Sequence, residues 1–325
     1  MDYPALRRLI EEKGLLNKTP GYYIRTSAIL VALFTGTWII YYYVRNFYIQ
    51  IGIVCLLGFL GFQFGLLAHD AGHRAVSTKR WLNETIGYLS LTFINGISIH
   101  HWETKHNAHH RSPNFNPGDP DIEQVFAYDT TQARARKGLL KWITKHQIAF
   151  FVPLHALSVF DMTRTSFQHV LLRCPFKRKM IELIGLLMHL VLWIGIPSYF
   201  IGFWKAALLY AIGTLVRGLY ASLVFVPNHV GMPLPKPTDK LSYLEKQVIT
   251  ARNLTPSFFK DYIFGGLNYQ IEHHLFPNMS RKYLKKAKTI IKNYCLTNKI
   301  PYKETGFFTC YKDVFTHMSQ VGKAA

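Results

Sequence analysis

Four long runs of apolar and aromatic residues dominate the chain. A helix needs roughly 20 apolar residues to cross the hydrocarbon of a bilayer, and each of the four runs approaches or exceeds that length. A very short connection near Arg45 separates the first two, and a short turn near Trp204 and Lys205 separates the last two. We therefore predict four transmembrane helices, at about residues 27–44, 49–68, 180–203 and 206–226.

Two shorter apolar runs, Ile86–Ile99 and Ile148–Phe160, fall below spanning length. Runs of this length are more often interfacial or re-entrant than spanning. Between them, residues 114–121 are rich in Pro, Gly, Asn and Asp, which predicts a loop. The expected fold class is an all-α integral membrane protein. We expect a single domain of residues 1–325, in which four transmembrane helices carry a helical cap made of residues 69–179 and 227–325.

Composition and charge also point to a membrane. The 325 residues are 49% hydrophobic and yet carry a formal net charge of +20, a combination that suits apolar spans with basic aqueous ends. The positive charge favours anionic lipid headgroups, an acidic redox partner or a phosphate-bearing substrate. Nucleic acid is not expected as a partner, because long apolar runs have no place in a soluble nucleic-acid-binding domain. The four scattered cysteines form no C-x-x-C pair and are expected to be reduced packing residues.

Three short segments place histidines at helical spacing. His69 and His73 stand at i and i+4, directly after the second apolar run. The other two segments each put three side chains at i, i+3 and i+4, which is one face of a helix. These are His106, His109 and His110 in the second segment, and Gln270, His273 and His274 in the third. Three such boxes in one chain need a common explanation.

A metal centre gives that explanation. Neutral imidazole is a ligand for iron, zinc, copper and nickel. A catalytic zinc takes about three protein ligands, so the seven histidines of the boxes are too many for one such ion. They suit two metals that share a site, which in two-metal enzymes lie roughly 3.5–4 Å apart.

The order of boxes and spans predicts the topology. Four crossings leave all three boxes on the same side of the membrane, and the long segments on that side are rich in Lys and Arg. The positive-inside rule then places the boxes and both termini in the cytoplasm. A crossing by Ile86–Ile99 would put the first two boxes on opposite sides. The metal hypothesis therefore requires that run to stay at the interface.

The boxes resemble the signature of the membrane fatty acid desaturase family, which reads HxxxH, HxxHH and H/QxxHH. With a glutamine at its first position, the third box resembles that of the front-end, acyl-lipid and linoleoyl-CoA desaturases. The resemblance extends from about Gly61 to Tyr283 and includes the Asp119-Pro-Asp loop and the segment that begins Val226-Pro-Asn-His. The three boxes stand here as His69-Asp-Ala-Gly-His73, His106-Asn-Ala-His-His110 and Gln270-Ile-Glu-His-His274.

The resemblance implies an O2-dependent enzyme that introduces a cis double bond into a lipid- or CoA-linked acyl chain with a non-haem centre of two irons. Acyl methylene groups have no acidity for a base to exploit, so the metal must supply the oxidant. The implied ligands are His69, His73, His106, His109, His110, His229, His273, His274 and Gln270, the last through its carbonyl oxygen or through a metal-bound water. The neighbours expected to hydrogen-bond ligand imidazoles are Asp70, Glu272, Asn107 and Asn228.

The electron donor is expected to be a separate protein. Many front-end relatives carry a fused cytochrome b5 domain with a His-Pro-Gly-Gly haem motif. That motif does not occur in this sequence, and the segment ahead of the first span is too short for the domain. We expect a ferredoxin or a free cytochrome b5, whose acidic surface would suit the basic charge of the chain. The expected location is the bacterial inner membrane or the endoplasmic reticulum, with the site facing the cytoplasm.

Other readings remain open from the sequence. Hydroxylases and ketolases share similar boxes and the same oxidant, so oxygen insertion is the first alternative. A membrane haem protein would need histidine pairs inside the bilayer, and a zinc protein would leave half of the boxes idle. Within the spans, His189 is expected to form a hydrogen bond between helices. Arg217 is left open between a functional and a structural role.

Overall fold

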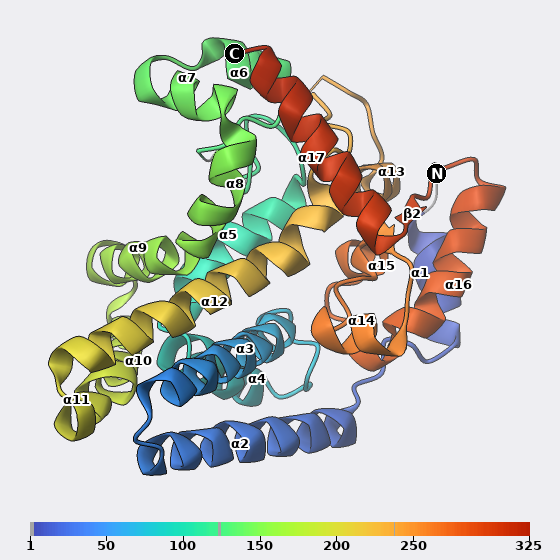
Figure 1. Cartoon of the computed structure of the whole chain (residues 1–325). Coiled ribbons are helices and arrows are strands. Elements are labelled where there is room, and N and C mark those ends of the chain that lie inside the picture. The colour runs from blue at the N-terminus through green and yellow to red at the C-terminus, as the bar shows by residue number, and fades with distance from the viewer. Residues whose placement is uncertain (1–2, 123–124, 237) are drawn as a thin grey trace. The chain divides into compact units, whose positions relative to one another are not determined.

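The computed structural model describes residues 3–122, 125–236 and 238–325, and these residues are mostly helical (Figure 1). The chain divides into two compact units. The first unit comprises Met1–Asn17, Lys105–Pro153 and Leu223–Ala325, and the second comprises Lys18–Thr104 and Leu154–Ser222. Three helices contribute residues to both units: α5 (Ile99–Arg111), α8 (Gln147–Ala156) and α12 (Phe203–His229).

Four helical stretches in the described part of the chain are long and apolar enough to cross a membrane. The predicted all-α fold with four long apolar helices is therefore confirmed. The third stretch runs from Phe176 to Ile201 and contains a π-helical turn in its middle. The stretches are α2 (Pro20–Tyr43), α3 (Phe47–Gly72), the series α10 (Phe176–Leu190), η2 (Val191–Gly195) and α11 (Ile196–Ile201), and α12.

The spanning helices extend beyond the apolar runs because polar signals set their ends. Pro20 lies in the first turn of α2, where the missing N–H of proline leaves no hydrogen bond unmade. The Asn46 side chain caps α3 by accepting the N–H groups of Tyr48 and Ile49. At its other end, α3 continues through His69 to Gly72, so the first histidine box lies on the last turn of a spanning helix and at its C-cap.

Aromatic side chains fill the core of the second unit. Phe34 and Trp38 of α2 lie with ring centroids 6.2 and 5.2 Å from that of Trp193. Backbone contact joins α3 to α12, because a Cβ added at Gly58 would lie only 2.6 Å from the carbonyl oxygen of Gly213. Small residues at such crossings let helices approach closely where lipid offers no hydrophobic driving force.

The apolar run Ile86–Ile99 does not form one continuous helix. Helix α4 (Arg80–Gly87) passes into the π-helix η1 (Tyr88–Phe93), and a turn with Gly96 at a φ of 70° leads into α5. The break leaves backbone carbonyls without helical partners. Irregular backbone at membrane depth is tolerated only where protein groups satisfy its hydrogen bonds.

Side chains from the later spans form hydrogen bonds to the backbone carbonyls of this broken segment. The Nδ1 of His189 lies 3.1 Å from the carbonyl oxygen of Ile94, and the indole of Trp193 donates to the same oxygen. The buried guanidinium of Arg217 donates to the carbonyl of Asn95 at 3.3 Å. The prediction for His189 is therefore confirmed, and Arg217 has a structural role in this part of the fold.

Glu182 connects α10 to the start of α5. Its side chain is fully buried; one carboxylate oxygen accepts the Thr92 hydroxyl at 2.9 Å and the other accepts the His100 N–H at 2.9 Å. His100 lies in the first turn of α5, where backbone N–H groups have no partner within the helix. A residue of one spanning stretch thus caps the helix on which the second histidine box lies.

In the first unit, four helices enclose an apolar core: α1 (Tyr3–Glu12), α13 (Tyr243–Ile249), α15 (Gln270–Leu275) and α16 (Arg281–Thr297). The Tyr3 hydroxyl donates to the carbonyl oxygen of Leu275 at 2.9 Å, which joins α1 to the end of α15. Two short strands, β1 (Asn253–Leu254) and β2 (Glu304–Thr305), pair in parallel. The remaining helices are α6 (Thr130–Ala135), α7 (Gly138–Lys145), α9 (Ser158–Leu172), α14 (Phe258–Ile263) and α17 (Phe307–Lys323).

We expect Glu182→Ala to lower the thermal unfolding temperature of the detergent-solubilised protein by several degrees. The substitution leaves the buried Thr92 hydroxyl and the His100 N–H without an acceptor, at a cost of about 1–3 kcal/mol for each unsatisfied group. Glu182→Gln retains one acceptor oxygen and should recover part of the loss. Glu12→Ala, at an exposed position of α1, is the control. Equal unfolding temperatures for the Glu182→Ala and Glu12→Ala variants would contradict the capping role.

Candidate metal centre

Six histidines of the first unit gather where α5, α12 and α15 contribute their ends. His106, His109 and His110 lie on α5, His229 is the last residue of α12, and His273 and His274 lie on α15. The helical spacing predicted for the second and third boxes is present, because α5 covers the whole second box and α15 begins at Gln270. Two groups of imidazoles can be distinguished by their contacts.

The first group consists of His109, His229 and His274. One ring nitrogen from each lies within 4.8 Å of those of the other two. The ring centroids of His109 and His229 are 4.7 Å apart, as are those of His229 and His274. His274 is fully buried and His109 nearly so. Three imidazoles from three helices therefore meet in one buried place.

The other ring nitrogen of each of these histidines faces an acceptor. The Nδ1 of His109 lies 2.9 Å from a carboxylate oxygen of Asp119, and the Nδ1 of His229 lies 2.9 Å from the carbonyl oxygen of Thr250. The Nδ1 of His274 lies 2.9 Å from Oε1 of Gln247. An acceptor at Nδ1 requires the proton there, which leaves Nε2 with a lone pair for a metal.

The amide of Gln247 is itself held in the orientation that this arrangement needs. Its Nε2 donates to the carbonyl oxygen of His110 at 2.8 Å, so its Oε1 is the atom that turns to His274. Amide orientations are assigned from such networks. Gln247 therefore joins the second box to the third through one side chain.

The second group consists of His106, His110 and His273. The Nε2 of His110 lies 3.1 Å from the Nε2 of His106 and 3.1 Å from that of His273. One ring nitrogen carries at most one proton, so it cannot donate to both neighbours. Three converging lone-pair donors suit a cation instead. Both groups thus have the donor chemistry of a metal site, with the nitrogen ligands that iron accepts.

Gln270 lies beside the first group. Its Oε1 accepts from Nδ2 of Asn228 at 3.0 Å, and its Nε2 lies 3.0 Å from Nε2 of His229. Asn228 also donates to the carbonyl oxygen of Val224 within α12. Of the two roles expected for Gln270, ligand through its amide oxygen or holder of a metal-bound water, the first would use an oxygen that here faces Asn228, while the amide nitrogen faces the imidazole.

The loop at residues 114–121 does more than connect elements. The Asp119 carboxylate accepts the backbone N–H of Asn114 at 2.7 Å and that of Asp121 at 2.9 Å, in addition to His109. Burial raises the pKa of Asp119, but the hydrogen bond and charge of His109 outweigh burial and hold that pKa below its usual value. Burial alone would lower the pKa of His109. The hydrogen bond to Asp119 outweighs burial, so the pKa of His109 lies above its usual value.

The first box lies in the second unit. The rings of His69 and His73 have centroids 4.8 Å apart, and the ring of Trp102 lies 5.5 and 5.8 Å from them. Asp70 accepts the Tyr23 hydroxyl at 2.7 Å, and a carboxylate oxygen lies 3.5 Å from Nδ1 of His69. Asp70, which we expect to accompany a ligand imidazole, thus lies next to the imidazole of His69.

Glu272 and Asn107, which we also expect to hydrogen-bond ligand imidazoles, have surroundings that differ from those of Asp70. Glu272 is fully buried, and its carboxylate accepts from Nδ2 of Asn253 at 2.6 Å and from the Tyr302 hydroxyl at 2.8 Å. Burial raises the pKa of Glu272 to about 7. Asn253 also accepts the N–H of Ile271 at 2.9 Å, so this network holds the backbone of the third box. Asn107 lies on the exposed side of α5.

Sequence reasoning did not identify the Nδ1 partners. The sequence shows Asp119 only as part of a motif and gives no signal for Gln247 or Thr250. No spacing rule relates them to the histidines, because they come from a loop and from α13 and its C-cap. Polar residues of these types are also common without any such role, so only the contacts identify them.

Comparison with known proteins agrees with this arrangement. The family model described as fatty acid desaturase matches residues 46–306. The chain is 28% identical to the acyl-lipid (9-3)-desaturase of Physcomitrium patens, over 100% of this chain and 63% of that protein. It is 29% identical to the Delta(6)-fatty-acid desaturase fat-3 of Caenorhabditis elegans, over 95% of this chain and 72% of that protein.

A second nematode protein, the Delta(5) fatty acid desaturase fat-4, is 29% identical over 94% of this chain and 70% of its own length. The chain thus spans roughly two thirds of the length of these relatives. The family match covers three of the four candidate spans, from α3 onward, and all three histidine boxes. With its four candidate spans and its clustered imidazoles, the chain belongs to the fatty acid desaturase family, and it is a multi-pass membrane oxidoreductase of that family.

Proposed function

We propose that this protein is an O2-dependent fatty acyl desaturase that introduces a cis double bond into a lipid- or CoA-linked acyl chain. The ligands proposed for two irons are His69, His73, His106, His109, His110, His229, His273 and His274. The observation that supports the proposal best is the orientation of His109, His229 and His274. Each has its Nδ1 at an acceptor, and one ring nitrogen from each lies within 4.8 Å of those of the other two.

A bound di-iron centre supplies the activation of O2 and the removal of two hydrogens from the acyl chain. Two electrons from the donor and two protons complete the reduction of O2 to two molecules of water. The residues of the chain hold the ligands in place: Asp119, Thr250 and Gln247 fix three imidazole tautomers, which also makes these imidazoles more basic ligands. Burial of His109 and His274 keeps bulk water from the oxidant.

Gln270 has a supporting role in the proposal. Asn228 engages its oxygen, and its amide nitrogen faces the metal-binding nitrogen of His229. We propose that Gln270 hydrogen-bonds a water at the centre and that Asn228 orients it. A ligand role through the amide oxygen would first require the Asn228 hydrogen bond to break.

The surroundings of the reaction follow from charge and topology. The positive-inside rule supports a cytoplasmic position for the boxes, in the bacterial inner membrane or the endoplasmic reticulum. The net charge of +20 supports an acidic electron donor, a ferredoxin or a cytochrome b5. The acyl chain enters from the lipid phase, where its methylene groups already lie.

We expect the purified protein to contain about two irons per chain and to show no haem Soret band. His109→Ala, His229→Ala and His274→Ala should each remove a ligand and reduce the bound iron, measured by elemental analysis. His146→Ala is the control, because His146 is exposed in α7's C-cap. Haem, a single zinc, or unchanged iron in all three variants would refute the metal assignment.

The Nδ1 partners give a separate test. Asp119→Asn and Gln247→Leu should each weaken iron binding or activity roughly 10–100-fold. The first replaces a carboxylate oxygen by an amide NH2 donor, which favours the other tautomer of His109, and the second removes the acceptor that fixes the tautomer of His274. Gln247→Glu keeps an acceptor for His274 and should retain more iron than Gln247→Leu. Asp161→Asn changes an exposed carboxylate and serves as the control. Full iron occupancy in both Asp119→Asn and Gln247→Leu would show that these hydrogen bonds do not orient ligands.

The reaction is tested by expression in a host that has a suitable reductase, followed by fatty acid profiling with location of double bonds. We expect a new unsaturated fatty acid with a cis double bond. His73→Ala, His110→Ala and His274→Ala should each abolish it. A hydroxylated or keto product instead of an alkene would replace the proposed reaction by oxygen insertion at the same centre.

A further inference from the structure

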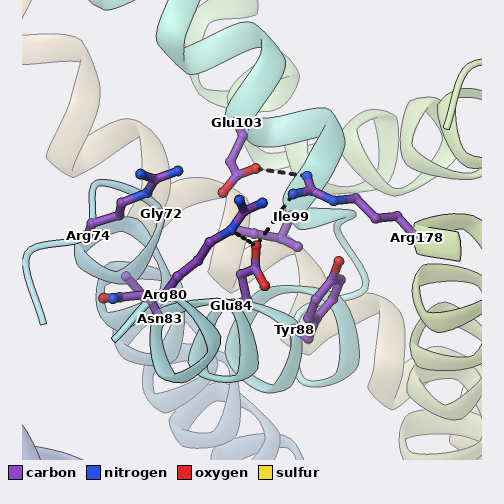
Figure 2. A pocket seen from close by; sticks show the side chains of 10 residues that line it. Gly72, Arg74, Arg80, Asn83, Glu84, Tyr88, Ile99, Glu103 and Arg178 are labelled. Atoms are coloured by element: carbon purple, nitrogen blue, oxygen red, sulfur yellow. Dashed lines mark hydrogen bonds and ion pairs between the residues drawn. The ribbon is translucent and has the colours of Figure 1, made fainter. Parts of the chain in front are cut away.

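Arg252 is a fully buried arginine between the C-cap of α13 and strand β1. Its surroundings differ from those of the arginines in the charged pocket of Figure 2, where Arg80 and Arg178 both form ion pairs with Glu84. A buried guanidinium costs free energy unless acceptors surround it. The acceptors that surround Arg252 therefore indicate what this residue holds.

The contacts of Arg252 surround the last turn of α12. Its backbone N–H donates to the carbonyl oxygen of Asn228 at 3.0 Å, and its Nε donates to that of Pro227 at 2.6 Å. One terminal nitrogen, Nη2, donates to the carbonyl oxygen of Val230. These carbonyls lie on both sides of His229, the last residue of α12. Arg252 therefore fixes the backbone that carries this imidazole.

The end of α12 needs donors from outside the helix. The last carbonyls of a helix have no N–H partner within it, and they form the negative end of the helix dipole, which favours a cation. Pro227 also lacks an N–H, so the carbonyl oxygen of Leu223 instead accepts the Tyr311 hydroxyl at 2.7 Å. At the final carbonyls, Arg252 supplies both the donors and the positive charge.

The same short segment also contacts the imidazole of His229. The carbonyl oxygen of Thr250 lies 2.9 Å from Nδ1 of His229. The remaining terminal nitrogen of Arg252, Nη1, lies 3.6 Å from a carboxylate oxygen of Asp313 in α17, which compensates the buried charge. Both the ring and the backbone of His229 are thus held by residues 250–252.

The next residue, Asn253, holds the beginning of α15. Its Oδ1 accepts the N–H of Ile271 in the first turn of that helix at 2.9 Å. Because Arg252 and Asn253 are consecutive, one short segment of backbone holds the end of α12 and the beginning of α15. These are the helices that carry His229 and His274.

We propose that Arg252 is a positioning residue of the metal centre, which holds the last turn of α12 so that the imidazole of His229 stays beside those of His109 and His274. The ring centroid of His229 lies 4.7 Å from that of each of the other two. This inference rests on the proposed function, because it takes His229 as a metal ligand. Without the guanidinium, carbonyl groups on both sides of His229 lose their donors, and the last turn of α12 rearranges.

The test measures metal binding to the full chain in detergent, with Co²⁺ as the probe. Co²⁺ accepts the same imidazole ligands, and its d–d absorption reports their number and geometry. Arg252→Met removes the guanidinium and keeps an unbranched side chain. We expect it to weaken Co²⁺ binding roughly 10–100-fold, the usual effect of losing a group that orients a ligand, and to change the d–d absorption. Arg252→Lys keeps the charge and should recover part of the affinity.

Arg136→Met is the matched control. The Arg136 guanidinium also donates to a backbone carbonyl, that of Phe126 at 3.3 Å, but Arg136 lies at the C-cap of α6, outside the helices that carry the boxes. We expect this control to retain the Co²⁺ affinity and absorption of the wild type. Circular dichroism and size-exclusion chromatography show whether each variant is folded. If Arg252→Met does not fold, Arg252→Lys is compared with Arg136→Lys. Equal Co²⁺ affinities within the compared pair would overturn the proposal.

A double-mutant cycle tests whether Arg252 acts through His229. In a His229→Ala background, Arg252→Met should weaken Co²⁺ binding further by less than about twofold, because the imidazole that Arg252 positions is already absent. A further loss as large as that in the wild-type background would show that Arg252 affects the centre by another route, and would also overturn the proposal.

Co²⁺ binding is measured without turnover, so it separates this inference from the proposed reaction. A wild-type chain that binds Co²⁺, with the expected loss in Arg252→Met but without any new unsaturated product, would retain the positioning role and remove the desaturase reaction. An active desaturase in which Arg252→Met binds Co²⁺ as tightly as the wild type would retain the reaction and remove the positioning role.

Discussion

The site depends on which nitrogen of each imidazole carries the proton. In His109, His229 and His274, that choice is made by an acceptor beyond the ring: a carboxylate, a backbone carbonyl and an amide oxygen. A histidine with the wrong tautomer presents N–H instead of a lone pair, and no metal binds there. The loop with Asp119 and the helix with Gln247 therefore matter to the centre as much as the boxes themselves.

In the second unit, the corresponding constraint is that free backbone carbonyls need hydrogen-bond donors. The segment between η1 and α5 interrupts its helix, and the carbonyls freed there are bonded by His189, Trp193 and Arg217 from later spans. Inside a membrane, no water is available to form hydrogen bonds with such groups. The polar residues within these spans thus stabilise an irregular connection that leads directly into α5. The buried carboxylate of Glu182 then caps the first turn of that helix.

The sequence identified what is local and periodic. Span lengths follow from hydropathy, and the boxes follow from residues at i, i+3 and i+4, so the four long helices and the clustered histidines could be predicted. Tertiary partners could not. Gln247 and Thr250 carry no pattern, and Arg217 could not be assigned because its acceptors exist only after the helix breaks near Asn95. Hydropathy alone does not show where the first two long helices begin, because Pro20 and Asn46 carry their start signals.

The contact of Tyr3 has a consequence for the N-terminal helix. Its ring lies between Tyr243 of α13 and Phe276 at the end of α15, and its hydroxyl bonds the last carbonyl of α15. Both helices carry groups of the centre, Gln247 on one and His273 and His274 on the other. Tyr3, in the first turn of α1, therefore helps to hold α13 and α15 in place. Displacement of α1 would therefore loosen the helices that carry these histidines, although α1 itself contributes none of them.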